Sequence, residues 1–269
     1  MDDAAVIASA GVVGHSRIAG GDGPVSDTHL VIIPSFNSGP LLARTVAAAR
    51  RYWGPVWVVV DGSTDQSGDA VEMMARIDPV LRVLRLPVNQ GKGAAVRHGL
   101  NVARLHGFSH ALVMDADCQH PADQIPRFMA ASAAAPDALI MGQPVFGRDA
   151  PRVRVVARRL CNFWAAVETG RRVGDTLFGF RVYPIAALLS VMQESRGMRR
   201  FDFDPEAVVR LAWRSVPLRH LPTQVRYLTR AEGGVSHFKY LRDNLLLTGM
   251  HLRLCRLAIM RLLRITHWL

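Results

Sequence analysis

Two aspartates separated by one residue follow an apolar run in the segment ALVMDADCQHP, residues 111–121. In an extended chain, side chains two residues apart point the same way, so Asp115 and Asp117 can face a single ion. Two carboxylates this close repel each other unless a positive group lies between them. Mg²⁺ and Mn²⁺ take oxygen ligands and share them with substrate phosphates. The pair therefore favours a divalent-cation site over a helix cap near Pro121, which would explain only one acidic residue.

Polar residues also follow two earlier apolar runs. Asp61, in DGSTD, suits either a turn or an acceptor for a nucleobase N–H or a ribose hydroxyl, and Ser35 and Asn37, in PSFNSG, have the same two interpretations. The segment NQGKGAAVRHG places Lys92 between two glycines at an expected helix start, which suits an anion. A plain helix-start turn explains that pattern equally well, and the spacing is not that of a Walker loop.

Apolar strand patterns alternate with helical patterns over the first half of the chain. The expected strands cover residues 29–34, 56–61, 82–87, 110–115 and 138–142. This alternation predicts an α/β fold with a mainly parallel central sheet and helices on both faces. Ligands bind such sheets at the carboxyl ends of the strands, so the three polar motifs should converge on one edge.

The second half begins with a basic, helical stretch over residues 151–173, whose arginines suit a solvated helix face or phosphate contacts equally well. Strands are expected in 176–184 and 216–228, and helices in 185–193 and 201–214. The acidic turn FDFDPE contains Asp204 and Glu206. An acceptor hydroxyl would need a general base there, with Glu206 the first candidate and Asp204 the second, whereas an anionic phosphate acceptor would not. Asp204, directly before a proline, is also a good helix N-cap.

The net charge of +11 on 269 residues indicates an anionic partner, such as nucleotide phosphates or a membrane surface. Sparse aromatic residues argue against nucleic acid. The three cysteines are far apart, which predicts neither a zinc site nor a disulfide framework and favours a reducing, cytoplasmic compartment. The N-terminus lacks the basic start of a secretory signal.

The last 25 residues, 245–269, form an expected amphipathic helix. Arginines 253, 256, 261 and 264 fall on one side at 100° per residue, and most of the leucines and isoleucines fall on the other. This pattern is typical of a helix that binds a membrane surface. A helix docked on the domain or on a second subunit would give the same pattern.

Taken in order, the strand-end motifs VIIPSFNSG, VVVDGSTD and MDADCQHP resemble glycosyltransferase family 2, the nucleotide-sugar-dependent enzymes of the GT-A fold. NQGKGAAVRHG, GDTLFGFRVYP, FDFDPEAVVR and GGVSHF are similar to the polyprenyl- and dolichyl-phosphate sugar transferase branch. The resemblance covers residues 29–240 and implies a GT-A domain there. The Ala- and Gly-rich residues 1–28, which show no periodicity, predict a mobile leader, and residues 241–269 are the basic amphipathic segment.

The same resemblance implies roles for individual residues. It places these residues in the nucleotide-sugar site: Pro34, Ser35, Asn37, Asp61, Lys92, Asp115 and Ala116. The implied metal ligands are Asp115, Asp117 and Gln119, which would bridge Mg²⁺ or Mn²⁺ to the diphosphate. Arg181 and Ser236 would face phosphate oxygens. The residues expected to take part in catalysis are Asp117, Glu206, Asp204 and Arg181.

The expected activity is a metal-dependent, inverting transfer of a sugar from a UDP- or GDP-sugar to a lipid or polyprenyl phosphate, at the cytoplasmic face of the membrane. Two other functions are compatible with parts of the pattern. A sugar nucleotidyltransferase would also use an α/β fold and Mg²⁺, but its glycine-rich first loop is absent from PSFNSG. A non-catalytic, membrane-surface nucleotide-sugar binder would not need the intact Asp-x-Asp pair.

Overall fold

The computed structural model describes residues 23–145, 152–225 and 240–263. Within these ranges seven strands form one sheet in the order β3-β2-β1-β4-β6-β5-β7. The strands are β1 (His29–Ser35), β2 (Val56–Asp61), β3 (Leu81–Leu86), β4 (His110–Val113), β5 (Leu139–Val145), β6 (Arg181–Pro184) and β7 (Leu218–Gln224). Neighbouring strands are parallel except that β6 is antiparallel to both β4 and β5, which confirms the mainly parallel sheet.

The strand order reverses at the centre of the sheet, between β1 and β4. The chain proceeds from β1 to β2 and β3 on one side and then returns to place β4 on the other side of β1. In open α/β sheets, ligands bind where the order reverses in this way, in the crevice at the carboxyl ends of the strands. The carboxyl ends of β1 and β4 carry the PSFNSG and DADCQH motifs, so both motifs lie at this crevice.

The central strands are apolar because both of their faces are covered. In β1, Leu30 and Ile32 belong to one core, whereas Val31 and Ile33 belong to the other, and all four are fully buried. Alternate residues of a strand point to opposite faces, so a continuous apolar run is what a strand between two helical layers requires.

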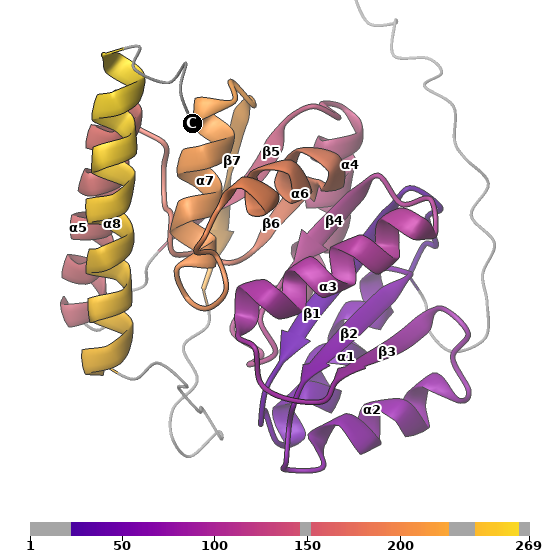
Figure 1. Cartoon of the computed structure of the whole chain (residues 1–269). Helices are drawn as coiled ribbons and strands as arrows, with labels where there is room; N and C mark the ends of the chain where they lie inside the picture. The colour runs from indigo at the N-terminus through magenta and orange to yellow at the C-terminus, as the bar shows by residue number, and fades with distance from the viewer. Residues whose placement is uncertain (1–22, 146–151, 226–239, 264–269) are drawn as a thin grey trace, which may run out of the picture.

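Helices cover both faces of the sheet (Figure 1). They are α1 (Pro40–Tyr52), α2 (Ser67–Ala75), α3 (Lys92–Leu105), α4 (Ile125–Ala133), α5 (Arg152–Thr169), α6 (Ile185–Glu194), α7 (Phe203–Trp213) and α8 (Tyr240–Leu262), with a short 3-10 turn, η1 (Ala122–Gln124). Helices α1, α2 and α4 share one core with the sheet, and α3, α6 and α7 share the other.

Helices α5 and α8 lie side by side at one end of the molecule, beyond α7 (Figure 1). Two buried carboxylates attach α8: Glu168 of α5 contacts His251, and Glu206 of α7 contacts Arg253. Burial alone would lower the pKa of His251, but its hydrogen bonds to Cys161 and Glu168 outweigh burial and raise the pKa to about 9. The expected amphipathic helix therefore packs on the folded body through an inner face.

Several boundaries differ from the sequence predictions. The Ser26 N–H donates to the Gly54 carbonyl, and the Gly54 N–H donates to the Pro24 carbonyl. Part of the predicted leader is therefore attached to the domain. The stretch 176–184 forms a strand only from Arg181, and in 216–228 the described residues form one strand, β7, instead of two. No helix in the described ranges is long and apolar enough to cross a membrane.

Two histidines stack at the amino edge of the sheet, far from the crevice. His29 and His110, paired in register as the first residues of β1 and β4, have ring centroids 4.4 Å apart. Nε2 of His29 lies 3.1 Å from the Ser132 hydroxyl. Burial, with His110 adding to it and Asp27 opposing it, lowers the pKa of His29 to about 4. The folded protein therefore holds this ring neutral.

The first prediction concerns acid stability. Because the folded pKa of His29 is below its unfolded value, the unfolded chain binds the extra proton, and stability falls as the pH drops from 6.5 towards 4. By pH 5 this group alone should cost about 2 kcal/mol. Urea unfolding of wild type and His29→Gln at pH 7.5 and pH 5 should show a smaller acid loss for the variant. Equal losses in both proteins would contradict the prediction.

Candidate functional site

The loops after β1 and β2 are braced against each other. The Asn37 backbone N–H donates to the Ser63 hydroxyl at 3.0 Å, and its side-chain oxygen accepts the Thr64 N–H at 2.8 Å. The Asp65 carboxylate accepts the Gly39 N–H at 2.8 Å. Two of the predicted nucleoside motifs are thus one hydrogen-bonded unit, with Asn37 in a left-handed conformation at φ 46°.

Asp61, at the end of β2, braces a third loop. Its two carboxylate oxygens accept the N–H groups of Gln90 and Gly91 at 2.8 and 2.7 Å, and the residue is almost fully buried. These bonds fix the turn that precedes α3, where Gly91 adopts a φ of 101°. Because Lys92 directly follows Gly91, Asp61 also positions Lys92. Contact with a nucleobase remains a prediction for Asp61, as it does for Pro34 and Ser35.

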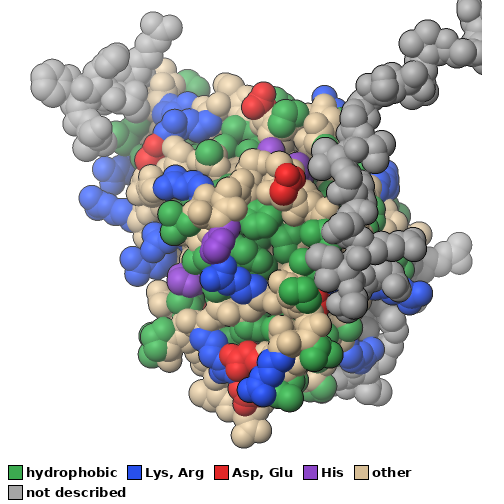
Figure 2. All heavy atoms as spheres, turned by 90° about the vertical axis from the view of Figure 1, so that its right-hand side faces the viewer, with side chains coloured by type: hydrophobic (Ala, Val, Ile, Leu, Met, Phe, Trp, Pro, Cys, Tyr) green, Lys and Arg blue, Asp and Glu red, His purple; other side chains and the backbone are tan. Residues whose placement is uncertain are grey.

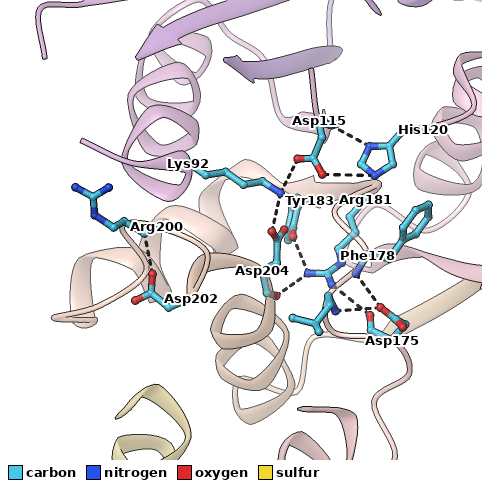
Figure 3. Close-up of polar contacts among 11 residues, drawn as sticks. Lys92, Asp115, His120, Asp175, Phe178, Arg181, Tyr183, Arg200, Asp202 and Asp204 are labelled. Carbon is cyan, nitrogen blue, oxygen red and sulfur yellow. Dashed lines mark hydrogen bonds and ion pairs between the residues drawn. The ribbon is translucent and has the colours of Figure 1, made fainter. Parts of the chain in front are cut away.

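The central feature of the crevice is a lysine between two carboxylates, with its side chain only 12% exposed (Figure 3). Nζ of Lys92 lies 2.6 Å from Oδ1 of Asp115 and 2.6 Å from Oδ2 of Asp204. Burial alone would lower the pKa of Lys92, but the two carboxylates outweigh burial and raise it. The ammonium therefore joins the predicted metal motif after β4 to the acidic turn at the start of α7.

The two aspartates of the Asp-x-Asp motif have opposite electrostatic environments. Burial alone would raise the pKa of Asp115, but Lys92 and His120 hold it below its usual range. Burial, followed by the charge of Asp115, raises the pKa of Asp117 to about 6. The predicted extended conformation is wrong: β4 ends at Val113, and residues 116–118 form a bend with Cys118 at φ 57°.

The donor set of this bend fits a hard divalent cation. Asp117 is a carboxylate under repulsion from Asp115, which is the arrangement that a cation relieves. A Cβ at Gly179 would come within 3.2 Å of Asp115 and 2.7 Å of Lys92, so the glycine leaves the Asp115 carboxylate uncovered there. Among the described residues, no group of three or more His, Cys, Asp or Glu side chains is arranged to hold a metal ion, so oxygens from the Gln119 amide and from substrate would have to complete a coordination shell.

The structure contradicts the predicted phosphate contact of Arg181. Its side chain is fully buried beneath the crevice, where Nη1 donates to the Tyr183 hydroxyl at 3.1 Å and to the Asp204 carbonyl at 2.7 Å, and Nη2 donates to the Asp175 carbonyl at 3.2 Å. A group with no solvent exposure cannot meet a soluble nucleotide. Arg181 instead holds the Asp204 backbone through its carbonyl.

Glu206 also differs from its predicted role. Its fully buried carboxylate accepts hydrogen bonds from the Ser195 hydroxyl at 2.5 Å, from Nε of Arg210 at 2.6 Å and from Arg253. A general base needs a free lone pair that faces the attacking oxygen, and this carboxylate is occupied by three donors from the protein. The structure thus makes Glu206 a structural anchor between α7 and α8.

Asp204 faces the crevice but does not cap its helix. Helix α7 begins at Phe203, so the predicted N-cap at Asp204 is wrong, and Asp202 precedes the helix instead. Asp202 accepts the N–H groups of Met198 and Arg200 and shapes the turn before α7. The Oδ1 atom of Asp204 is buried and has no hydrogen-bond partner among the described residues.

His120 also belongs to this site, although it was not predicted from the sequence. Its Nδ1 accepts the Asp115 N–H at 3.0 Å, its Nε2 lies 3.6 Å from the Asp115 carboxylate, and burial lowers its pKa to about 4. The ring is therefore neutral and orients Asp115. Its position within DADCQHP was the available signal. The predicted phosphate contact Ser236 lies outside the described residues.

The second prediction tests the buried position of Arg181. Arg181→Met would leave two backbone carbonyls and the Tyr183 hydroxyl without their donor, so the free energy of unfolding should fall by about 3–5 kcal/mol. Tyr183→Phe removes one of these acceptors and should cost about 1 kcal/mol. Urea unfolding measures both. Unchanged stability of Arg181→Met together with lost nucleotide-sugar binding would restore the phosphate role.

Comparison with known proteins identifies the family. The model of glycosyl transferase family 2 matches residues 30–191, which is more than half of the chain. Polyprenol monophosphomannose synthase of Mycolicibacterium smegmatis is 28% identical over 193 residues, covering 70% of this chain and 71% of the relative. Undecaprenyl-phosphate mannosyltransferase of Micrococcus luteus is 27% identical over 188 residues, covering 68% of this chain and 77% of the relative.

A solved structure agrees in fold. Glucosyl-3-phosphoglycerate synthase from Mycobacterium tuberculosis, in complex with UDP, superposes with a TM-score of 0.60 at 17% identity, covering 85% of this chain and 80% of that chain. At this identity the likeness shows the fold alone. The described sheet, with its crevice between β1 and β4, is therefore of the GT-A type. The chain belongs to glycosyl transferase family 2 and is a glycosyltransferase.

Proposed function

We propose that this chain transfers a sugar from a UDP- or GDP-sugar to the phosphate of a polyprenyl lipid, with inversion at the anomeric carbon and with Mg²⁺ or Mn²⁺ bound. The observation that carries the proposal is the Lys92 bridge, which joins the carboxylate Asp115 at the sheet crevice to Asp204 at the start of α7. One side of the bridge suits a donor diphosphate and the other suits an acceptor.

The comparisons support both substrates. Similar relatives are named for polyprenol and undecaprenyl-phosphate acceptors. A structural neighbour binds Mn²⁺ and UDP-glucose. The crevice at the ends of β1, β2 and β4 is where α/β sheets hold nucleotides. Asn37 and Asp61 stiffen the loops that would enclose the nucleoside. Ser35 lies in the same motif as Asn37, and Ala116 lies between Asp115 and Asp117.

The metal ligands in this proposal are Asp115, Asp117 and Gln119. They would hold a divalent cation, which would supply positive charge to offset the charge on the departing diphosphate. Lys92 contributes a fixed positive charge beside Asp115 that does not depend on metal binding. Because Lys92 is held by two carboxylates, its ammonium is positioned before substrate arrives, which is the condition for effective electrostatic stabilisation.

A lipid phosphate acceptor needs no general base, so in this proposal the unpartnered Oδ1 of Asp204 takes no proton from the acceptor. A lipid phosphate oxygen already carries negative charge and attacks the anomeric carbon without losing a proton. The carbon–oxygen bond to the nucleoside diphosphate breaks, and the diphosphate leaves with the electron pair. Asp204 then holds Lys92 in place and orients it, while Glu206 fixes α7.

The third prediction tests the metal-binding carboxylate. Asp117→Ala should lower sugar transfer about 100-fold or more, because charge on the leaving group is no longer neutralised. Asp123→Ala removes an exposed carboxylate of η1 and should retain full activity. The assay uses the purified chain, radiolabelled UDP- or GDP-sugar and short-chain polyprenyl phosphate. Full turnover by Asp117→Ala would mean that the pair does not serve the reaction.

The same assay separates the proposal from a nucleotidyltransferase. Sugar transferred to the lipid with release of nucleoside diphosphate supports the proposal, whereas sugar-1-phosphate formed on addition of pyrophosphate contradicts it. A thermal-shift panel of nucleotide sugars with and without Mn²⁺ identifies the donor, because a ligand that binds only the folded state raises the melting temperature.

The fourth prediction distinguishes a phosphate acceptor from a hydroxyl acceptor. Loss of a general base typically lowers the rate by about 10²–10⁴-fold. Because Asp204 only orients Lys92 in the proposal, Asp204→Asn should lower kcat about tenfold or less and leave the pH profile of kcat unchanged. A loss above 10²-fold that removes the acidic limb of the profile would instead assign Asp204 as the base for a hydroxyl.

A further inference from the structure

Most of the large hydrophobic side chains exposed in the described ranges lie on α5 and α8. On α5 they are Val156, Leu160, Phe163, Trp164 and Val167. On α8 and the residue after it they are Leu245, Leu252, Ile259, Leu262 and Leu263. Scattered exposed hydrophobic residues are normal on a protein surface, but a concentration on two adjacent helices is not.

On each helix these residues form a stripe. Val156, Leu160, Phe163 and Val167 are spaced by four, three and four positions, which places them on one side of α5 at 100° per residue. On α8 the spacing is seven, seven and four positions, which places the stripe on one side of that helix too. Its members are Leu245, Leu252, Ile259 and Leu263. The sequence analysis read 151–173 as a basic helix and missed this stripe.

Both stripes face away from the folded body because the opposite sides of the helices are buried against it. On α5 the buried side includes Cys161, Ala165 and Glu168, and on α8 it includes His251 and Leu254. The Cys161 thiol lies 3.2 Å from Nε2 of His251, and the Glu168 carboxylate lies 2.7 Å from Nδ1 of the same ring. This buried contact fixes the two helices relative to each other.

The charges around the stripes are of one sign. Among the described side chains of α5 and α8, the exposed charged residues are arginines: Arg159, Arg242 and Arg256, together with Arg261, whose guanidinium lies over the Trp213 ring of α7. The two acidic residues there, Glu168 and Asp243, are buried. Figure 2 shows the opposite end of the molecule, where Asp and Glu side chains also reach the surface among the Lys and Arg side chains.

We propose that α5 and α8 together form one docking face for an anionic lipid bilayer. An apolar stripe bordered by arginines is the chemistry of a surface that lies in the headgroup region. The rings of Phe163 and Trp164, whose centroids lie 5.6 Å apart, suit the boundary between headgroups and acyl chains. A second copy of the chain would bring the same arginines against each other in a symmetric interface, so like charges oppose that occupant.

The position of α7 relates this face to the reaction. Helix α7 packs against α5, its Glu206 anchors α8 through Arg253, and its first turn carries Asp204 at the crevice. One helix therefore separates the docking face from the proposed acceptor site (Figure 1). The inference deepens the proposed function, on whose lipid acceptor it rests, by assigning the surface that brings the enzyme to that lipid.

The fifth prediction is tested by vesicle flotation with the purified full chain. Vesicles of equal parts phosphatidylcholine and phosphatidylglycerol should carry the wild-type protein upward, and phosphatidylcholine vesicles should carry much less. The double variant Leu160→Gln/Leu252→Gln, with one change in each stripe, should bind the anionic vesicles about tenfold more weakly. High salt should weaken wild-type binding, because exposed charges are screened.

The matched control changes two hydrophobic residues elsewhere, Ile77 at 81% exposed and Leu105 at 84%, which are even more exposed than the two stripe residues that the variant changes. Ile77→Gln/Leu105→Gln lies after α2 and at the end of α3 and should float like wild type. Equal flotation of the stripe variant and wild type, or absence of wild-type flotation, overturns the inference. A wild-type dimer in light scattering that the stripe variant abolishes also overturns it, in favour of a second copy.

A second readout separates this inference from the proposed reaction. With a short-chain, detergent-dispersed polyprenyl phosphate, the stripe variant should transfer sugar at the wild-type rate, because no bilayer is involved. With acceptor embedded in anionic vesicles, its rate should fall with its binding. Flotation without any sugar transfer would retain the docking face and overturn the reaction, whereas transfer without flotation would do the reverse.

Discussion

The Lys92 ammonium is the interaction on which the rest of the site depends. It is largely buried, and a largely buried charge is tolerated only when opposite charges compensate for the lost hydration. Asp115 and Asp204 provide that compensation from elements far apart in sequence, after β4 and at the start of α7. Removing Lys92 would leave the two carboxylates without their shared counter-charge, so the bend after β4 and the start of α7 form one electrostatic unit.

The start of α3 is shaped to deliver that ammonium. Asp61 fixes Gln90 and Gly91, and the Ala94 N–H donates to the Arg199 carbonyl at 3.0 Å. A Cβ at Gly93 would come within 2.1 Å of the Met198 carbonyl oxygen, so only glycine permits this close approach. The two glycines that flank Lys92 in the sequence thus serve backbone packing, and the predicted anion-binding role falls to the lysine side chain.

The sequence predicted what depends on local periodicity and strand rules. Apolar runs followed by polar turns located the strands, and the edge rule for parallel sheets brought Asn37 and Asp115 to one crevice. The sequence predictions failed where contacts between residues far apart in the sequence determine which side chains are buried. Arg181 and Glu206 look like accessible charges in the sequence, but partners such as Tyr183, Asp204 and Arg253 bury them. The spacing of the apolar stripe on α5 is present in the sequence, but the many arginines of the same segment led to its interpretation as a basic helix.

The burial of Glu206 has a consequence for the organisation of the chain. A carboxylate with no solvent exposure depends on the arginines that neutralise it, and Arg253 comes from α8, the segment predicted as an appendage beginning at residue 241. Detaching α8 would leave Arg210 as the remaining cationic partner in the described contacts and expose the inner face of α5 around Glu168. Both losses oppose detachment, so α8 is part of the folded body and holds α7, with Asp204 at its tip, in register with the crevice.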